Sequence, residues 1–166
     1  YVLSEERLVN NHDFHKENTP IEELANESSL STTPETTKEI LSQLKPAFKP
    51  DGVITAGNSS QISDGAAALL LVSEDILNKF NLEPIAKIKS MAVVGTDPVL
   101  MLSGPIPATR KALDQAKLKP EDINLAEINE AFSSVVGAWR KEFPEINYEN
   151  INANGGSIAI GLSLIH

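Results

Sequence analysis

The sequence contains no cysteine in 166 residues. Disulfide bonds, thiolate metal sites and nucleophilic catalysis by a cysteine of this chain are therefore excluded. Basic residues are also few: 14 Lys and Arg stand against 23 Asp and Glu, which gives a net charge of -9. That charge disfavours nucleic acid and anionic membrane surfaces as partners. No apolar run is long enough to cross a bilayer and no stretch resembles a signal peptide, so we expect no membrane partner.

The remaining composition suits an ordinary globular core, because 41% of the residues are hydrophobic. Residues 1–33 are polar and acidic with little periodicity, and they predict a loop or linker. His12 and His15 lie in this stretch without a third ligand near them in sequence, so no metal site is predicted. The chain begins at Tyr1 rather than at a methionine, and we expect it to be a cut or incomplete chain.

Apolar periodicity predicts that helices and strands alternate over the rest of the chain. Helices are expected at 34–44, after a capping Ser73, at 106–116 and from Phe132 to Trp139. Strands are expected at 53–55, 66–72, 85–94 and 123–128, with 66–72 buried on both faces. Such alternation is typical of a layered α/β fold with a mixed, largely buried sheet.

The junction at Asn129 is the most informative position in this pattern. Asn129 follows a predicted strand and precedes a predicted helix, where a polar side chain can cap the helix. In open α/β sheets the carboxyl ends of strands are also where ligands bind. Local spacing alone leaves both interpretations open, and helix-capping asparagines are the commoner of the two.

Four ordered segments favour the functional interpretation. They are Thr55–Ala68 (TAGNSSQISDGAAA), Gly104–Thr109 (GPIPAT), Asn129–Phe132 (NEAF) and Asn152–Gly161 (NANGGSIAIG). In identity, order and spacing they resemble the segments of the thiolases. The resemblance runs from about Glu35 to Gly161 and covers only the carboxyl-terminal half of a thiolase, with a piece of the loop domain before it.

The resemblance implies a thiolase-like layered α/β fold, with an incomplete second βαβαββ repeat and helices packed on a mixed sheet. Residues 1–50 would form a loop-domain remnant and linker helix, and residues 51–166 an incomplete carboxyl-terminal domain. The implied activity is acyl transfer between acyl-CoA and CoA by reversible Claisen chemistry. Coenzyme A would be a substrate, with no permanently bound cofactor. A cytoplasmic homo-oligomer is expected for the full-length enzyme, with mitochondrial or peroxisomal locations left open.

The resemblance also assigns residues to that chemistry. Asn129 matches the asparagine that holds a water at an oxyanion site. The positions expected to contact CoA or the acyl group are Phe48, Ala56, Ser60, Met101, Ala131 and Phe132. Ala56 and Ser60 fall where thiolases contact the pantetheine or nucleotide, and Phe48 and Met101 fall near the acyl pocket.

The sequence departs from the thiolase pattern after Gly161. Leu162 stands where the catalytic histidine is expected, and His166 lies four residues too late to replace it. The nucleophilic cysteine of the family belongs to the amino-terminal half, so we expect this chain to be inactive alone. The alternative is a non-catalytic half that contacts CoA or assembles with a partner chain. A β-ketoacyl synthase is disfavoured by NEAF, because those enzymes have a histidine at that position.

Overall fold

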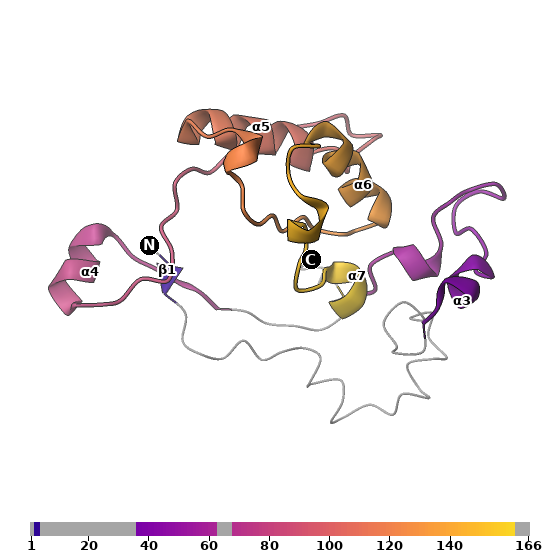
Figure 1. Ribbon diagram of the computed structural model, residues 1–166, viewed down its shortest axis with the longest axis horizontal. Coiled ribbons are helices and arrows are strands. Elements are labelled where there is room, and N and C mark those ends of the chain that lie inside the picture. Colours follow the sequence, from indigo (N-terminus) through magenta and orange to yellow (C-terminus); the bar gives the residue numbers. More distant parts are fainter. Residues whose placement is uncertain (1, 4–35, 63–67, 162–166) are drawn as a thin grey trace, which may run out of the picture.

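The computed structural model describes residues 2–3, 36–62 and 68–161. The elements in chain order are β1 (Val2–Leu3), α3 (Lys38–Ser42), η2 (Ala56–Asn58), β2 (Leu70–Leu71), α4 (Glu74–Phe80), α5 (Pro105–Ala116), η3 (Pro120–Asp122), α6 (Ser133–Glu142), η4 (Tyr148–Asn150) and α7 (Ser157–Ile160). Figure 1 shows α4 and β1 at one end of the molecule and α3 at the other, with α5, α6 and α7 between them.

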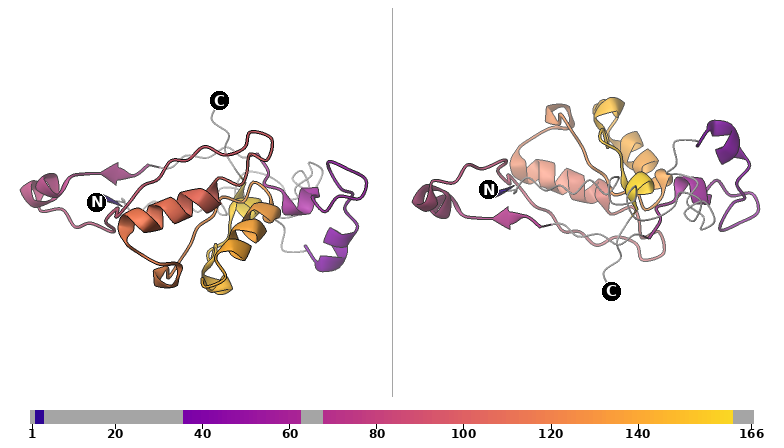
Figure 2. Two further views of the ribbon diagram at one scale, coloured as in Figure 1. Left: turned by 90° about the horizontal axis from the view of Figure 1, so that it is seen from above. Right: turned by 90° about the horizontal axis from the view of Figure 1, so that it is seen from below.

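The core lies between α5, α6 and the segment that follows α6. Its buried members are Trp139, Phe143, Ile146 and Ile151, against which Ile106, Ile123, Ala126, Ile128 and Val136 pack. Trp139 Nε1 donates to Thr109 Oγ1 on α5 over 2.9 Å, and Arg110 pairs with Glu142 at the outer edge of the two helices. Figure 2 shows α5 and α6 crossing against each other in both views. Ile106 of α5 and the apolar face of α6 thus contribute to one core, together with the segment that follows α6.

The predicted helices formed with small changes at their ends. α5 and α6 occupy the expected stretches, and Ser73 caps α4 by accepting from Ile76 N over 3.4 Å. The helix predicted for 34–44 corresponds to α3, which begins at Lys38, because the hydroxyl of Thr37 accepts from Ile40 N and Thr37 itself is extended. Residues 34–35, where the predicted helix would start, lie outside the described residues.

The strand predictions were largely wrong. Residues 53–55 form no strand, while 123–128 and 85–94 each contain a single isolated bridge residue, Ala126 and Ala86 respectively. The described part of the predicted strand 66–72 is 68–72, where β2 comprises Leu70–Leu71 and pairs antiparallel with Val2–Leu3. Those two leucines are 57% and 59% exposed, so they are not buried on both faces as predicted. An apolar run becomes a buried strand only when neighbours pair with it and a layer covers it.

Other contacts take the place of a sheet in the extended segments. Along 85–94, Ser90 Oγ donates to Ala112 O over 2.8 Å and Lys111 Nζ donates to Val93 O over 3.0 Å, which joins the segment to α5. The segment before α6 makes one parallel bridge, Ala126 with Ile151. These bonds satisfy part of the backbone without a continuous ladder.

Candidate functional site

The loop 55–60, which contains the predicted CoA contacts Ala56 and Ser60, is held in shape by hydrogen bonds from its own side chains. Thr55 Oγ1 accepts from Gly57 N (3.2 Å), and Asn58 Oδ1 accepts from Thr55 N (2.8 Å), which closes the η2 turn at both ends. Ser59 Oγ adds a bond to Thr55 O (2.7 Å). A Cβ at Gly57 would overlap the side chains of Leu41 and Leu44 on and just after α3. The small residue therefore lets the loop lie directly against that helix.

This loop is bonded to the segment just before α6. Ser59 forms an antiparallel bridge with Phe132, and Ser60 N donates to Ala131 O over 3.0 Å. The Phe48 ring lies edge-on to the Phe132 ring, with centroids 5.6 Å apart. Ala56 begins the η2 turn of the same loop. The fold thus brings together Phe48, Ala56, Ser60, Ala131 and Phe132, which the sequence places in separate segments.

Met101 is the predicted site residue for which the structure shows no contact with this group. It ends the turn that Asp97 begins, its side chain is 64% exposed, and its φ is +49°. The backbone amides of Leu100 and Val99 donate to the Asp97 carboxylate (3.0 and 2.8 Å) and lower its pKa below the ordinary value. That carboxylate is therefore charged at neutral pH and fixes the turn that presents Met101.

Beside this group, the Asn152 side chain makes hydrogen bonds that the backbone of a paired strand would otherwise make. Its Oδ1 accepts from Ile128 N (2.7 Å) and its Nδ2 donates to Ile128 O (3.0 Å). These are the two bonds that a neighbouring strand residue would make with its backbone. Asn152 has a φ of +51°, a conformation that asparagine tolerates better than most residues. The side chain thereby continues the single bridge between Ala126 and Ile151.

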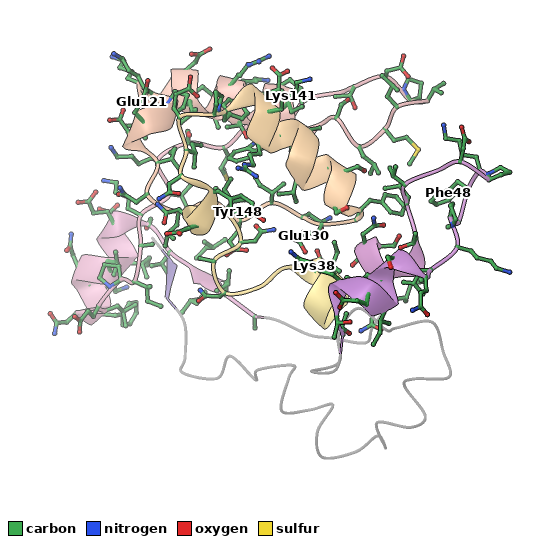
Figure 3. The ribbon with its side chains drawn as sticks, turned by 45° about the vertical axis from the view of Figure 1, so that its right-hand side comes forward. Lys38, Phe48, Glu121, Glu130, Lys141 and Tyr148 are labelled. Carbon is green, nitrogen blue, oxygen red and sulfur yellow. The ribbon has the colours of Figure 1, made fainter. Side chains whose placement is uncertain are left out.

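The carboxylate of Glu130 joins the 152–158 loop to the same place. Asn152 Nδ2 donates to Glu130 Oε1 over 2.7 Å, and Ile158 N donates to Glu130 Oε2 over 3.2 Å. Glu130 is half-buried, and Figure 3 shows it between α7 and the start of α6. A carboxylate that accepts several N–H bonds is well suited to hold a loop in place. Glu130 is not a first-turn acid of α6, because that helix begins at Ser133.

Substituting Gly156 with alanine should displace Glu130. A Cβ at this position would overlap the Glu130 carboxylate, whereas the Gly156 φ of −124° is open to any residue. The penalty is therefore steric, and we expect Gly156→Ala to lower the free energy of unfolding by about 1–3 kcal/mol. Urea denaturation followed by circular dichroism would measure the change.

Gly137→Ala is the matched control for this prediction. Gly137 lies inside α6 and a Cβ there would meet nothing within 4 Å. It should raise the free energy of unfolding by roughly 0.5–1 kcal/mol through helix propensity. Equal effects of the two substitutions would show that the Glu130 carboxylate does not restrict position 156.

Asn129 is exposed and does not cap α6, contrary to the commoner interpretation of its position. The helix has Phe132 as its N-cap residue, without a side-chain capping bond. Asn129 Oδ1 instead accepts from Ser157 Oγ over 2.9 Å, and Ser157 Oγ also accepts from Glu130 N over 2.9 Å. Among the described residues, none accepts a hydrogen bond from Asn129 Nδ2. The amide donor is thus available to a ligand.

Three residues of this group were not predicted from the sequence as site residues: Glu130, Asn152 and Ser157. All three lie inside the NEAF and NANGGSIAIG segments that carried the resemblance. The signal was therefore the motif itself, but nothing in the local pattern shows that their partners lie 22 to 28 residues away. Leu162 and His166, which bear on the catalytic histidine, lie outside the described residues, as do His12 and His15.

A surface hollow of about 580 Å³ lies elsewhere, against the carboxyl-terminal part of α6. The Arg140 guanidinium covers the Tyr148 ring in this hollow, 4.0 Å from its centroid. Its lining comprises Gly137, Arg140, Lys141, Pro144, Ile146, Asn147 and Tyr148. In Figure 3, Lys141 lies at the opposite end of α6 from Glu130. The hollow includes none of the residues predicted to contact CoA.

In residues 2–3, 36–62 and 68–161, no group of three or more His, Asp or Glu side chains is arranged to hold a metal ion. No helix in those ranges combines the length and the apolar character that a bilayer span requires.

Residues 82–164 match the family model described as thiolase, C-terminal domain, and residues 8–75 match the thiolase, N-terminal domain. The chain belongs to the thiolase family. Among curated relatives of this thiolase chain, the 3-ketoacyl-CoA thiolase of Marinobacter nauticus is 49% identical over 138 residues, which are 81% of this chain and 35% of the relative. The 3-ketoacyl-CoA thiolase of Escherichia coli K12 is 49% identical over 77% of this chain and 34% of its own length.

Solved structures agree with the family assignment. Human mitochondrial 3-ketoacyl-CoA thiolase in complex with CoA has a TM-score of 0.76 and 43% identity over 79% of this chain and 33% of its own. The Bacillus anthracis acetyl-CoA acetyltransferase has a TM-score of 0.75 and 42% identity over 78% and 33%. The thiolase-like α/β fold predicted from the sequence is confirmed. The chain spans about a third of the length of these relatives.

Proposed function

We propose that this chain is part of a thiolase-type acyltransferase that passes acyl groups between acyl-CoA and CoA. The observation that carries the proposal is the exposed carboxamide of Asn129, whose acceptor is bonded to Ser157 while its donor is available. It lies beside the loop that holds Ser60, through the bonds from Ser60 N to Ala131 O and from Ser60 Oγ to Ser157 O. A fixed donor of this kind can hold a water or stabilise a developing oxyanion.

In this proposal the residues divide between two tasks. Asn129 Nδ2 holds the water of an oxyanion site, where negative charge develops on the thioester oxygen during Claisen chemistry. Ala56 and Ser60 contact CoA, while Phe48, Met101, Ala131 and Phe132 form the apolar surroundings of the acyl chain. The names of the relatives, which include a thiolase solved with CoA, support this choice of substrate. The division of the chain at residue 50 stays a prediction.

The acyl group itself must be carried by a residue that this chain does not contain. Thiolate chemistry suits exchange between thioesters, because a thiolate is both a strong nucleophile and a good leaving group. The 166 residues contain no cysteine. We therefore propose that this chain has no acyl-transfer activity alone and contributes the Asn129 side of a shared site.

One observation favours the second candidate function, a non-catalytic part that assembles with a partner chain. Several apolar side chains are more than half exposed: Val53, Ile62, Leu69, Leu70, Leu71, Met91, Val93, Val99, Leu100, Met101 and Leu125. Exposed apolar surface of this kind marks a contact with another chain or segment. The two candidates differ in whether Asn129 matters to turnover once a cysteine-bearing half is supplied.

We expect the chain to bind CoA weakly through the Ser60 loop. The net charge of -9 disfavours a polyanionic ligand, so the dissociation constant should be near 1 mM, which corresponds to about −4 kcal/mol. Ser60→Ala removes the bond from Ser60 Oγ to Ser157 O (2.8 Å) and should weaken binding further. A titration followed by NMR chemical shifts would measure both constants.

Ser90→Ala is the control for the CoA titration. Ser90 Oγ also donates to a backbone carbonyl over 2.8 Å, that of Ala112, but it lies in another segment. This substitution should leave the dissociation constant unchanged. Micromolar CoA binding that Ser60→Ala does not alter would contradict the assignment of the loop.

A further inference from the structure

We infer that Ser157 is a positioning residue that sets which end of the Asn129 carboxamide faces the ligand. The inference rests on the proposed function, because it concerns how Asn129 presents its donor. Ser157 is the first residue of α7 and lies 28 residues from Asn129 in sequence. It also lies between the two segments that the proposed reaction uses, 129–132 and 56–60.

The bonds at Ser157 Oγ fix the direction of its proton. The backbone amide of Glu130 can only donate, so Ser157 Oγ accepts there, over 2.9 Å. A hydroxyl has a single proton to donate, and at Ser157 it goes to Asn129 Oδ1 over 2.9 Å. The hydroxyl is thus polarised by a fixed backbone donor on one side and used by an acceptor on the other.

This arrangement selects one of the two orientations of the Asn129 carboxamide. With Oδ1 toward Ser157, the hydroxyl proton is satisfied and Nδ2 is left to face a ligand. In the flipped orientation Nδ2 would face Ser157, and the hydroxyl proton would have no acceptor among the described residues. The flipped amide would also present its oxygen to a developing oxyanion, which repels it. A hydrogen-bond network is the appropriate criterion for assigning an amide orientation.

Ser157 is itself held by the residues that hold the rest of the site. Its carbonyl oxygen accepts from Ser60 Oγ (2.8 Å) and from Gly161 N (2.8 Å). The next amide, Ile158 N, donates to the Glu130 carboxylate (3.2 Å). A movement of the Ser60 loop on binding CoA would therefore displace Ser157, the residue that orients Asn129. Ser157 couples the proposed CoA contact to the proposed oxyanion donor.

The test compares Ser157→Ala with Ser157→Thr in the 166-residue chain. Alanine removes the hydroxyl, whereas threonine keeps it. The readout is the ¹⁵N relaxation of the Asn129 side-chain amide, with the indole N–H of Trp139, which donates to Thr109 Oγ1 in the core, as a report on the fold. In Ser157→Ala the order parameter of Asn129 Nδ2 should fall below about 0.6, the flexible range. In Ser157→Thr it should stay near the parent value.

Ser134→Ala is the matched control, because Ser134 is exposed on α6 and makes no hydrogen bond through its side chain among the described residues. It should leave the Asn129 amide unchanged. An Asn129 amide that is as rigid in Ser157→Ala as in the parent would overturn the inference. Equal mobility in the alanine and threonine variants would overturn it as well, because the hydroxyl would then not be the cause. No turnover is measured, so a failure of the proposed reaction would appear only in the activity assay discussed below.

Discussion

The 166-residue chain alone is expected to thiolyse acetoacetyl-CoA no faster than the uncatalysed reaction. It has no cysteine to accept the acyl group, and Leu162 stands where the imidazole partner of a thiolate is expected. Serine or water cannot exchange an acyl group with the CoA thiol comparably at neutral pH. Groups that act as a unit leave only residual catalysis when several are missing. Release of acetyl-CoA, followed by absorbance, would measure the rate.

Rebuilding the enzyme should restore turnover and give Asn129 a measurable role. The rebuilt protein adds a cysteine-bearing amino-terminal half, Leu162→His and the carboxyl-terminal segment of a thiolase. In that protein Asn129→Ala should lower kcat by about 10²–10³-fold, the usual effect of removing one oxyanion donor. Asn78→Ala, on the exposed face of α4, should leave kcat unchanged. An unchanged rate in Asn129→Ala would contradict the assignment and favour the non-catalytic alternative.

Trp139→Ala should strongly lower the free energy of unfolding. Trp139 is 2% exposed, lies at the centre of the core cluster and donates through Nε1 to Thr109 on α5. Removing a buried tryptophan typically costs about 3–5 kcal/mol. Total stabilities are only about 5–15 kcal/mol, so the loss is a large fraction of the whole. Urea denaturation followed by far-ultraviolet circular dichroism would measure it.

Two further variants separate the causes of this effect. Trp139→Phe keeps much of the apolar volume but loses the bond to Thr109, and should cost less than the alanine variant. Phe80→Ala removes an aromatic ring that is 59% exposed on α4, and should change stability by no more than about 0.5 kcal/mol. If Phe80→Ala cost as much as Trp139→Ala, the core would not lie between α5 and α6.

The helices were predictable because their signals are local. Pro105 at the first position of α5, Ser73 before α4 and the apolar spacing of α6 all act within one or two turns. A helix satisfies its own backbone, so its sequence contains most of the information that it needs. The limit is seen at α3, which was predicted from residue 34 and begins at Lys38, since neighbouring threonines offer equivalent caps.

Strands and the site depended on residues far apart in the chain. Segment 85–94 has the apolar alternation of a strand, yet it is joined to α5 by side-chain bonds to Ala112 and from Lys111. Segment 123–128 forms a bridge only at Ala126, and the next backbone hydrogen bonds, at Ile128, are made by the Asn152 side chain. A strand satisfies its backbone only through a partner, and local pattern does not name that partner.

By itself, the sequence determined the helices α4, α5 and α6, the family and the segments that carry the site. Only the tertiary structure decided which hydrogen bonds join those segments. In the folded chain Asn129 accepts a hydrogen bond from Ser157 and does not cap a helix, and Ser60 is hydrogen-bonded to Ser157, 97 residues away. The physical reason is that capping and helix periodicity act over a few residues. The hydrogen bonds that orient Asn129 come from a loop whose place is set by the Glu130 carboxylate, and that placement exists only once the chain has folded.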